Sequence, residues 1–500
     1  MNRLIENGIS ERAVARFLDE AKRLEVDLHS MEIWRNGVQA FALYGYPYTP
    51  ETMHRMYSSG KMLVALAAMK AIEENKLELT SRVTDYFPGR LPEDLDEKFS
   101  GLTVYHMLTM NTGHAHDTMW SMRADKDWIH GFFSEKPERA PGEFFFYNNG
   151  APFVLSHVVK EAVKMDYLDY LKQRFFKEMD VRTEADLTPD GSTDSSGVSI
   201  RMGDFPKLAR LLLDQGRWNG KQLLDPGLAS MMGQYHVSSI QSDQVKNVAM
   251  DTRFGYGFYL WRNSVGGYRL DGGRGQFGLV FPDLNMTVSF MASEEDQGLI
   301  PELFWKQIYP YCWSEKAPEG ERAGEEPGKT WQALPGWDRV YGDKSGIDGC
   351  TYVLEENEMG MEEIRFEIGE EKICFTGVQK GEQFRFEAGL RGGCSVNEQF
   401  PEMPEYDWFM DHVSGNSDDR FYVQGEFYRS EDFTGKREIR IYGRNLRQTQ
   451  YWVWNFRIAD GGIRIEVDHG AWYCVKNRGR LELLPHIPAP VMIFGTMKEE

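Results

Sequence analysis

Apolar residues near the start of the chain recur at three- and four-residue steps, the spacing of one face of an α-helix. They are Val14, Phe17, Leu18, Ala21 and Leu24. Ser10 precedes them and predicts an N-cap. Residues 62–72 are rich in Ala, Leu and Met and contain no helix breaker, which predicts a buried helix. Further helices are expected over residues 103–110 and 151–163.

Strand-like runs follow the first of these helices and return later. Residues 31–34 and 38–44 are separated by Arg35-Asn36-Gly37. An Asn-Gly pair between apolar runs predicts a hairpin, because both residues tolerate positive φ. The β pattern reappears at residues 255–261, 279–281 and 286–292, around a glycine-rich turn.

The pattern changes sharply after residues 314–329, SEKAPEGERAGEEPGK, which are charged and contain almost nothing to bury. Such composition predicts a linker. Beyond it, period-two alternations such as Ile364/Phe366/Ile368 recur with hardly any helical spacing, which predicts an antiparallel β-barrel or sandwich. The expected organisation is a first domain over residues 1–315, a linker over 316–330 and a β-rich domain over 331–500.

Charge and composition narrow the class of protein. A chain of 500 residues with a net charge of −20 is a poor partner for nucleic acid or an anionic membrane. The N-terminus carries charges throughout, and no apolar stretch reaches the roughly 18 residues of a membrane span. The five cysteines are odd in number and form no Cys-x-x-Cys pair. We therefore expect a reduced, cytoplasmic protein without a disulfide framework or a zinc site.

Candidate chemistry begins with Ser58-Ser59-Gly60-Lys61, the one Ser-x-x-Lys in the chain. Residues three apart on a helix share a face, so the hydroxyl and the amine can meet. Burial among the apolar residues that follow would favour the neutral amine, the form that acts as a base on serine. The alternative is a chance pair at the start of a helix.

Two further segments carry polar or flexible groups. Tyr147-Asn148-Asn149 offers a hydroxyl for proton relay and an amide for binding, or else a packed tyrosine with a helix-capping asparagine. Residues 270–276, LDGGRGQ, lie between two β runs. Their glycines would let a strand edge approach a substrate, or would simply form a hairpin.

The order of these three motifs resembles the penicillin-recognising serine hydrolases. The resemblance covers about residues 8–312 and is closest to the class C β-lactamase-like branch, with its esterases, D-aminopeptidases and 6-aminohexanoate-dimer hydrolases. Segments such as LTVYHMLTMNTGH and GGRGQFGLVFPDLNMTVSF also match this branch. The resemblance implies an α/β (α+β) β-lactamase-like sandwich, in which helices flank an antiparallel sheet and a helical subdomain follows the Ser-x-x-Lys helix.

The resemblance also implies roles for the residues. Ser58 would form an acyl-enzyme, Lys61 and Tyr147 would share acid–base work, and Asn149 would assist them. Substrate and oxyanion contacts would come from the third motif, in which Gly273 is the expected N–H donor. They are expected at Asp271, Gly272, Gly273 and Arg274.

The third motif departs from the family in one respect. Relatives often begin it with Lys or His, which contacts a substrate carboxylate, whereas the aligned position here is Leu270. Arg269 or Arg274 could supply the charge instead. The change weakens the case for β-lactam or D-Ala-D-Ala substrates.

Two other patterns have alternative interpretations. His114, His116 and Asp117 could bind zinc, but no further ligands cluster nearby in the sequence, and a turn after a helix is favoured. Trp452, Trp454 and Trp472 could form a ligand cradle, although period-two spacing favours the core of a barrel.

These observations predict a serine hydrolase domain that cleaves a small ester, amide or peptide without a metal or organic cofactor. One alternative is a sensor or binding module of the same fold that does not turn over. Another is a D-amino-acid peptidase or β-lactamase. The β-rich domain would narrow the active site or mediate self-association into a homo-oligomer, and the sequence favours neither.

Overall fold

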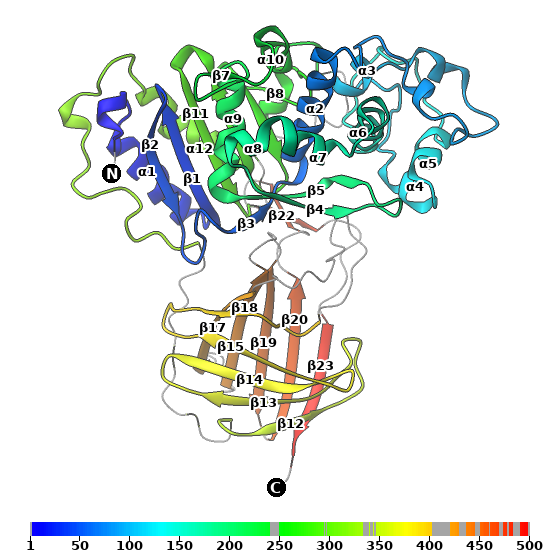
Figure 1. Ribbon diagram of the computed structural model, residues 1–500. Helices are drawn as coiled ribbons and strands as arrows, with labels where there is room; N and C mark the ends of the chain where they lie inside the picture. Colours follow the sequence, from blue (N-terminus) through cyan, green and yellow to red (C-terminus); the bar gives the residue numbers. More distant parts are fainter. Residues whose placement is uncertain are drawn as a thin grey trace. The chain divides into compact units, whose positions relative to one another are not determined.

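The computed structural model describes residues 3–240, 250–294, 296, 298–333, 340, 344, 347–402, 421–429, 437–445, 451–459, 461–469, 474–477, 480–483 and 491–498. The chain divides into two compact units, Met1–Trp331 and Gln332–Glu500 (Figure 1). No helix in the described ranges is both long and apolar enough to cross a bilayer.

A six-stranded antiparallel sheet organises the first unit, in the order β2-β1-β11-β10-β9-β8. Its strands are β1 (Leu28–Arg35), β2 (Val38–Tyr44), β8 (Trp261–Arg262), β9 (Tyr268–Gly272), β10 (Gln276–Phe281) and β11 (Met286–Ala292). Smaller sheets contain β3 (Met53–Arg55), β4 (Thr183–Leu187) and β5 (Thr193–Arg201), and β6 (Arg217–Trp218) and β7 (Lys221–Gln222).

Helices cover both faces of the large sheet. On one face α1 and α12 share a core with the strands, in which Phe17, Val288 and Phe304 are fully buried. On the other face lies α9, because a Cβ built on Gly278 of β10 would meet Ala209 at 3.5 Å. The helices are α1 (Glu11–Arg23), α2 (Lys61–Glu73), α3 (Val104–Leu108), α4 (Met119–Ala124), α5 (Trp128–Ser134), α6 (Gly150–Val163), α7 (Tyr167–Leu171), α8 (Lys177–Met179), α9 (Phe205–Leu213), α10 (Pro226–Gly233) and α12 (Leu299–Gln307).

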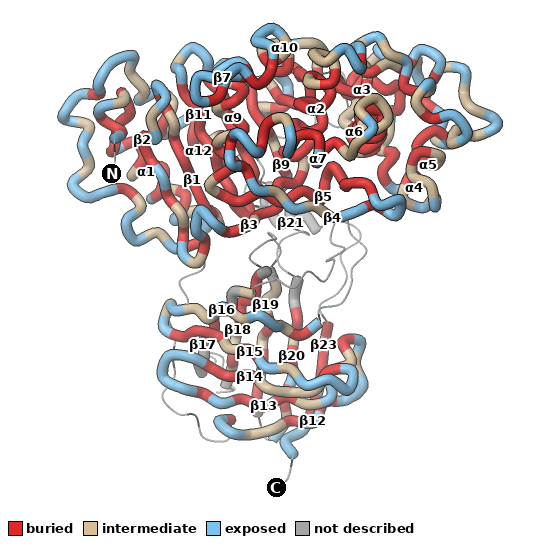
Figure 2. The backbone as a smooth tube through the Cα atoms, viewed as in Figure 1, coloured by how far each residue is buried: buried red, intermediate tan, exposed pale blue. Residues whose placement is uncertain are grey.

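A helical region follows α2 in sequence and gathers beyond it, away from the large sheet (Figure 1). Helix α2 is buried almost all round, as its apolar sequence predicts (Figure 2). The α/β sandwich with a helical subdomain is therefore confirmed.

Local signals explain the ends of several elements. The Ser10 hydroxyl accepts from the Ala13 N–H at 2.9 Å and caps α1. Asn36 and Gly37 have φ of 52° and 75°, and they join β1 to β2 as predicted. The strand expected over residues 255–261 is wrong: Gly255 and Tyr259 have φ of 102° and 56°, which interrupt extended backbone, so β8 begins only at Trp261.

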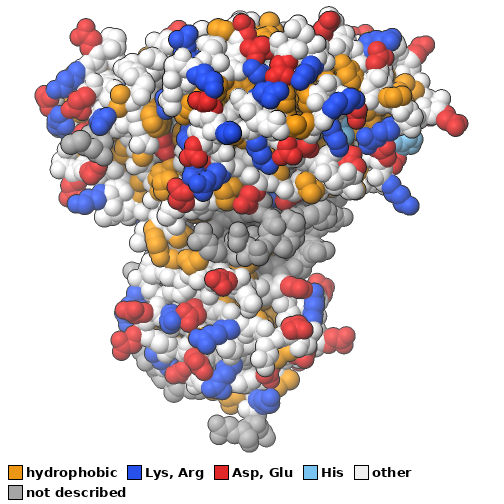
Figure 3. Space-filling view, viewed as in Figure 1, with side chains coloured by type: hydrophobic (Ala, Val, Ile, Leu, Met, Phe, Trp, Pro, Cys, Tyr) orange, Lys and Arg blue, Asp and Glu red, His pale blue; other side chains and the backbone are white. Residues whose placement is uncertain are grey.

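The charged segment 314–329 belongs to the first unit and contacts its N-terminal helix. The Ser10 hydroxyl donates to Glu321 at 2.5 Å, and Arg322 lies 3.5 Å from Glu11 of α1. Just beyond the segment, the Trp331 indole N–H donates to the Leu28 carbonyl at 2.9 Å. Elsewhere on the face in Figure 3, acidic and basic side chains are interspersed.

The second unit is a β-barrel in its described residues. Nine strands form a closed ring, because β15 pairs with β17, and β16 adds to β17. A separate hairpin joins β21 and β22. The strands are β12 (Thr351–Leu354), β13 (Met361–Ile368), β14 (Lys372–Gln379), β15 (Glu382–Gly389), β16 (Ser395–Asn397), β17 (Phe421–Arg429), β18 (Arg437–Asn445), β19 (Tyr451–Ala459), β20 (Gly462–His469), β21 (Cys474–Asn477), β22 (Arg480–Leu483) and β23 (Val491–Met497).

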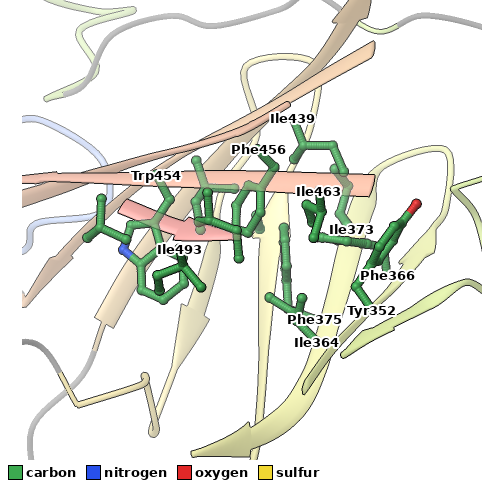
Figure 4. Packing of buried hydrophobic residues seen from close by; sticks show 14 of the residues in the cluster. Tyr352, Ile364, Phe366, Ile373, Phe375, Ile439, Trp454, Phe456, Ile463 and Ile493 are labelled. Carbon is green, nitrogen blue, oxygen red and sulfur yellow. The ribbon is translucent and has the colours of Figure 1, made fainter. Parts of the chain in front are cut away.

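Aromatic and aliphatic side chains fill the barrel (Figure 4). Phe375 stacks on Phe386 with ring centroids 4.6 Å apart. Trp454 is fully buried in this core, and Trp452 packs against it. Trp472 lies outside the described residues. The first two tryptophans thus belong to the barrel core, which the spacing favoured over a ligand cradle.

Candidate active site

Ser58 lies in a tight turn between β3 and α2. The Met56 N–H donates to Val198 O of β5 at 2.9 Å, and residues Tyr57–Gly60 form a 3₁₀ turn that leads into α2. Buried Tyr57 has a φ of 48°, the left-handed region that non-glycine residues seldom occupy. Such backbone strain persists where the surrounding structure holds it, often at functional sites. The turn leaves Ser58 partly exposed at the start of a buried helix.

Lys61 meets Ser58 one turn later. Its Nζ donates to the Ser58 Oγ at 2.7 Å, and the lysine is 1% exposed. Burial lowers the pKa of Lys61 to about 7, against the opposing charges of Asp117, Asp194 and Asp271. A lysine of this pKa is substantially neutral near pH 7 and can accept a proton.

Tyr147 is close to both Ser58 and Lys61. Its hydroxyl hydrogen-bonds with the Ser58 side chain, and the Lys61 Nζ lies 5.0 Å from the centre of its ring. Burial raises the pKa of Tyr147 well above its ordinary value, so the phenol keeps its proton. Its ring stacks on Trp261 at 5.7 Å, which fixes its orientation. The structure thus brings Ser58, Lys61 and Tyr147 together.

Asn149 makes a contact with Asp117 that the sequence did not indicate. Its Nδ2 donates to Asp117 Oδ2 at 2.5 Å, and its backbone N–H donates to Asp117 Oδ1 at 3.0 Å. Asn149 is also the residue before α6. In the sequence, Asp117 was notable only as a possible metal ligand. Nothing in its local motif indicated a hydrogen bond to Asn149, 32 residues further along the chain.

The glycine-rich turn of the third motif packs against the segment that carries Ser58. A Cβ built on Gly272 would lie 2.4 Å from Met56 O and 3.0 Å from the Ser59 N. Only glycine permits this approach of β9 to the 3₁₀ turn. The Gln276 amide donates to Gly273 O at 3.0 Å and holds the turn between β9 and β10.

The two arginines of this motif are held inside the protein. Arg269 is 2% exposed and pairs with Asp271 at 2.8 Å and Asp251 at 3.0 Å. Arg274, 3% exposed, has a φ of 64°, and its Nη1 donates to Ser293 Oγ at 3.4 Å. Arg269 is thus engaged by two carboxylates within the protein.

Strand alternation decides which residue of β9 faces the lysine. Leu270 is fully buried, and its Cδ1 would lie 3.2 Å from a Cβ on Gly278, on the sheet face that α9 covers. Asp271 instead acts on Lys61, and burial raises the pKa of its carboxyl. The negative charge of Asp271, one of the residues expected at the site, therefore favours the protonated form of Lys61.

The two histidines near Asp117 have separate partners. His114 is fully buried, with Nδ1 3.0 Å from Thr112 Oγ1 and Nε2 3.0 Å from Glu135 O. Burial lowers its pKa to about 4. His116 contacts Glu138 at 2.9 Å. Among the described residues, no group of three or more His, Cys, Asp or Glu side chains is arranged to hold a metal ion.

The fold and this serine–lysine–tyrosine cluster define a class of protein, the β-lactamase-like serine hydrolases. Residues 19–299, more than half of the chain, match the family described as Beta-lactamase. The chain belongs to this family, whose members are hydrolases.

Individual relatives are distant. A 6-aminohexanoate-dimer hydrolase of Paenarthrobacter ureafaciens is 22% identical over 235 residues, which cover 42% of this chain and 59% of that protein. The chain thus spans under two thirds of that relative. An octameric penicillin-binding protein homologue of Pyrococcus abyssi is 14% identical, with a TM-score of 0.45 and coverage of 96% and 99% of the two chains. A penicillin binding protein of Bacillus halodurans is 16% identical, with a TM-score of 0.44 and coverage of 57% and 98%.

Proposed function

We propose that the chain hydrolyses a small ester or amide through an acyl-enzyme on Ser58. The observation that carries the proposal is the 2.7 Å hydrogen bond from the buried Lys61 Nζ to the Ser58 Oγ. A neutral lysine at that distance takes the serine proton as the oxygen attacks the substrate carbonyl.

Tyr147 would serve as the acid in the same step. Its hydroxyl hydrogen-bonds with Ser58 and stays protonated, because burial raises its pKa. It can therefore give a proton to the leaving group, and Lys61 can restore it. Water would then attack the acyl-enzyme carbonyl, with the same groups removing its proton.

The oxyanion would be stabilised by backbone N–H groups of Ser58 and Gly273. Gly272 supports this role because its lack of a Cβ lets β9 pack against the 3₁₀ turn. Preorganised donors of this kind lower the barrier by about 3–4 kcal/mol per donor.

We propose a narrower class of substrates than the family that the sequence resembles accepts. Arg269 and Arg274 are buried, and Asp271 acts on Lys61. Arg269 is held in ion pairs with Asp251 and Asp271, so we expect that it does not bind a substrate carboxylate, and we favour neutral esters and amides over β-lactams and D-Ala-D-Ala peptides.

A fluorophosphonate probe with intact-mass detection, beside p-nitrophenyl ester turnover, tests the nucleophile. We expect one label on the wild type and none on Ser58→Ala. Ser59→Ala is the matched control, because Ser59 is adjacent but its hydroxyl donates to Met56 O at 2.6 Å. Label that survives in Ser58→Ala would remove the assignment.

Labelling without turnover would instead support a non-hydrolysing acyl-binding module. Nitrocefin cleavage as fast as cleavage of p-nitrophenyl acetate would favour the β-lactamase alternative. Each alternative thus has its own outcome in the same set of assays.

A further inference from the structure

Asp117 contacts Asn149 of the candidate site, although no motif in the sequence indicated that it would. It follows His116 in the loop before α4, and its carboxylate is only partly exposed. Oδ1 accepts the backbone N–H groups of Asn149 at 3.0 Å and Met119 at 3.1 Å, and Oδ2 accepts the Asn149 Nδ2 at 2.5 Å. The loop is thereby joined to the first turn of α6.

These contacts fix the orientation of the Asn149 carboxamide. A carboxylate only accepts hydrogen bonds, so the amide nitrogen, not its oxygen, must face Asp117. The Asn149 Oδ1 is left as an acceptor on the opposite side of the amide. Without Asp117 the amide could turn and present donors instead.

The charge of Asp117 also acts on the reacting groups. The charges of Asp117, Asp194 and Asp271 raise the pKa of Lys61. Those of Asp271 and Asp117 also raise the pKa of Tyr147. Asp194 pairs with Arg123 at 3.0 Å, and Asp271 pairs with Arg269 at 2.8 Å. The hydrogen bonds that Asp117 receives in the described ranges come from neutral N–H groups.

We propose that Asp117 is a positioning residue of the hydrolytic site, which orients the Asn149 carboxamide and supplies negative charge opposite Lys61. The proposal rests on the proposed function, because it assigns Asp117 a role in the chemistry of Ser58. It explains why an aspartate, rather than a neutral cap, accepts hydrogen bonds from the N-terminal ends of both α4 and α6.

Asp117→Asn tests this role, since it removes the negative charge and replaces one of the two carboxylate oxygens that accept hydrogen bonds by an NH₂ group. We expect kcat/KM for a p-nitrophenyl ester to fall roughly 10- to 100-fold, the cost of misplacing a group in the site. The acid limb of the pH profile should move to lower pH by about one unit, because removing the negative charge of Asp117 disfavours the Lys61 ammonium and lowers the pKa of Lys61. Asn149→Ala should lower kcat/KM but leave the acid limb in place.

Asp225→Asn is the matched control. Asp225 accepts the Gly227 and Leu228 N–H groups at the start of α10, so it has a similar structural role away from the site. It should leave both kcat/KM and the acid limb unchanged. Asp117→Glu, which keeps the charge, should keep the wild-type acid limb and guards against loss of the fold in Asp117→Asn.

The outcomes separate the two proposals. A wild type that neither takes the fluorophosphonate label nor cleaves esters overturns the proposed function, and the role of Asp117 with it. A wild type with a normal acid limb, shared unchanged by Asp117→Asn, overturns the Asp117 role alone. A lower melting temperature with unchanged kcat/KM would likewise reduce Asp117 to a structural residue.

Discussion

Single residues carry the chemistry proposed for this site, and the proposed roles of Ser58 and Tyr147 depend on Lys61. It is 1% exposed, so water does not stabilise its charged form. The surrounding carboxylates partly offset that cost, and the balance sets its pKa at about 7. An ordinary surface lysine, with a pKa near 10.4, would be almost fully protonated at neutral pH and useless as a base.

The pH dependence of hydrolysis follows from this value. Lys61 must be neutral to accept the Ser58 proton, so kcat/KM should rise as the pH increases through about 7 and then level off. Lys61→Arg should lose activity by about 10²-fold or more, because a guanidinium does not deprotonate in this range. Ester hydrolysis measured from pH 5 to 9 checks both expectations.

Lys61→Arg also separates Lys61 from Tyr147. A variant that kept near-normal activity and the same acid limb would transfer the base role to Tyr147. Circular dichroism of the variant controls for loss of the fold, since arginine must fit a fully buried position.

The sequence could predict that Ser58, Lys61 and Tyr147 come together, because local spacing and motif order indicate it. It could not predict the Asp117–Asn149 contact, which joins two loops 32 residues apart through tertiary structure. Nor could it show that Arg269 is already paired with Asp251 and Asp271.

At the scale of elements, the approach of β9 to the 3₁₀ turn sets the geometry of the site. Whether Leu270 or Asp271 faces Lys61 depends on which face of β9 packs on α9, and that is a matter of register. The hairpin of β1 and β2 was predictable because its turn residues fix the register locally. Residues 255–261 were misassigned because positive φ at Gly255 and Tyr259 overrides an apolar run.

Gly272→Ala should therefore disable the site without touching a reacting group. Its Cβ would lie 2.4 Å from Met56 O, a backbone atom that can move only with the turn. We expect a roughly 10²-fold loss of kcat/KM, as for about 1 Å of misplacement. Fluorophosphonate labelling kinetics of Ser58 would report the same loss.

Gly101→Ala serves as the control, because a Cβ there meets nothing within 4 Å. It should label at the wild-type rate. Equal labelling of Gly272→Ala and Gly101→Ala would mean that the β9 contact does not set the position of Ser58.

At the scale of the whole molecule, each of the two units has a hydrophobic core built from its own residues. The core of the large sheet lies within residues 1–331 and that of the barrel within 332–500. Separate cores favour separate unfolding transitions, since cooperativity follows shared packing. The barrel was predictable as a class from period-two alternation, but its closure was not, because the pairing of β15 with β17 joins strands distant in sequence.

Phe375→Ala tests whether the two units unfold independently. Phe375 is fully buried and stacks on Phe386 at 4.6 Å, so its truncation should destabilise the barrel by about 3–5 kcal/mol. Calorimetry should show one transition moving to lower temperature while the other stays. The rate of Ser58 labelling should not change. Phe494→Ala is the control, because Phe494 is 46% exposed, and it should change neither the two transition temperatures nor the labelling rate. If Ser58 labelling falls together with the barrel transition, the hydrolase unit depends on the barrel for its fold, and the two cores form one cooperative system.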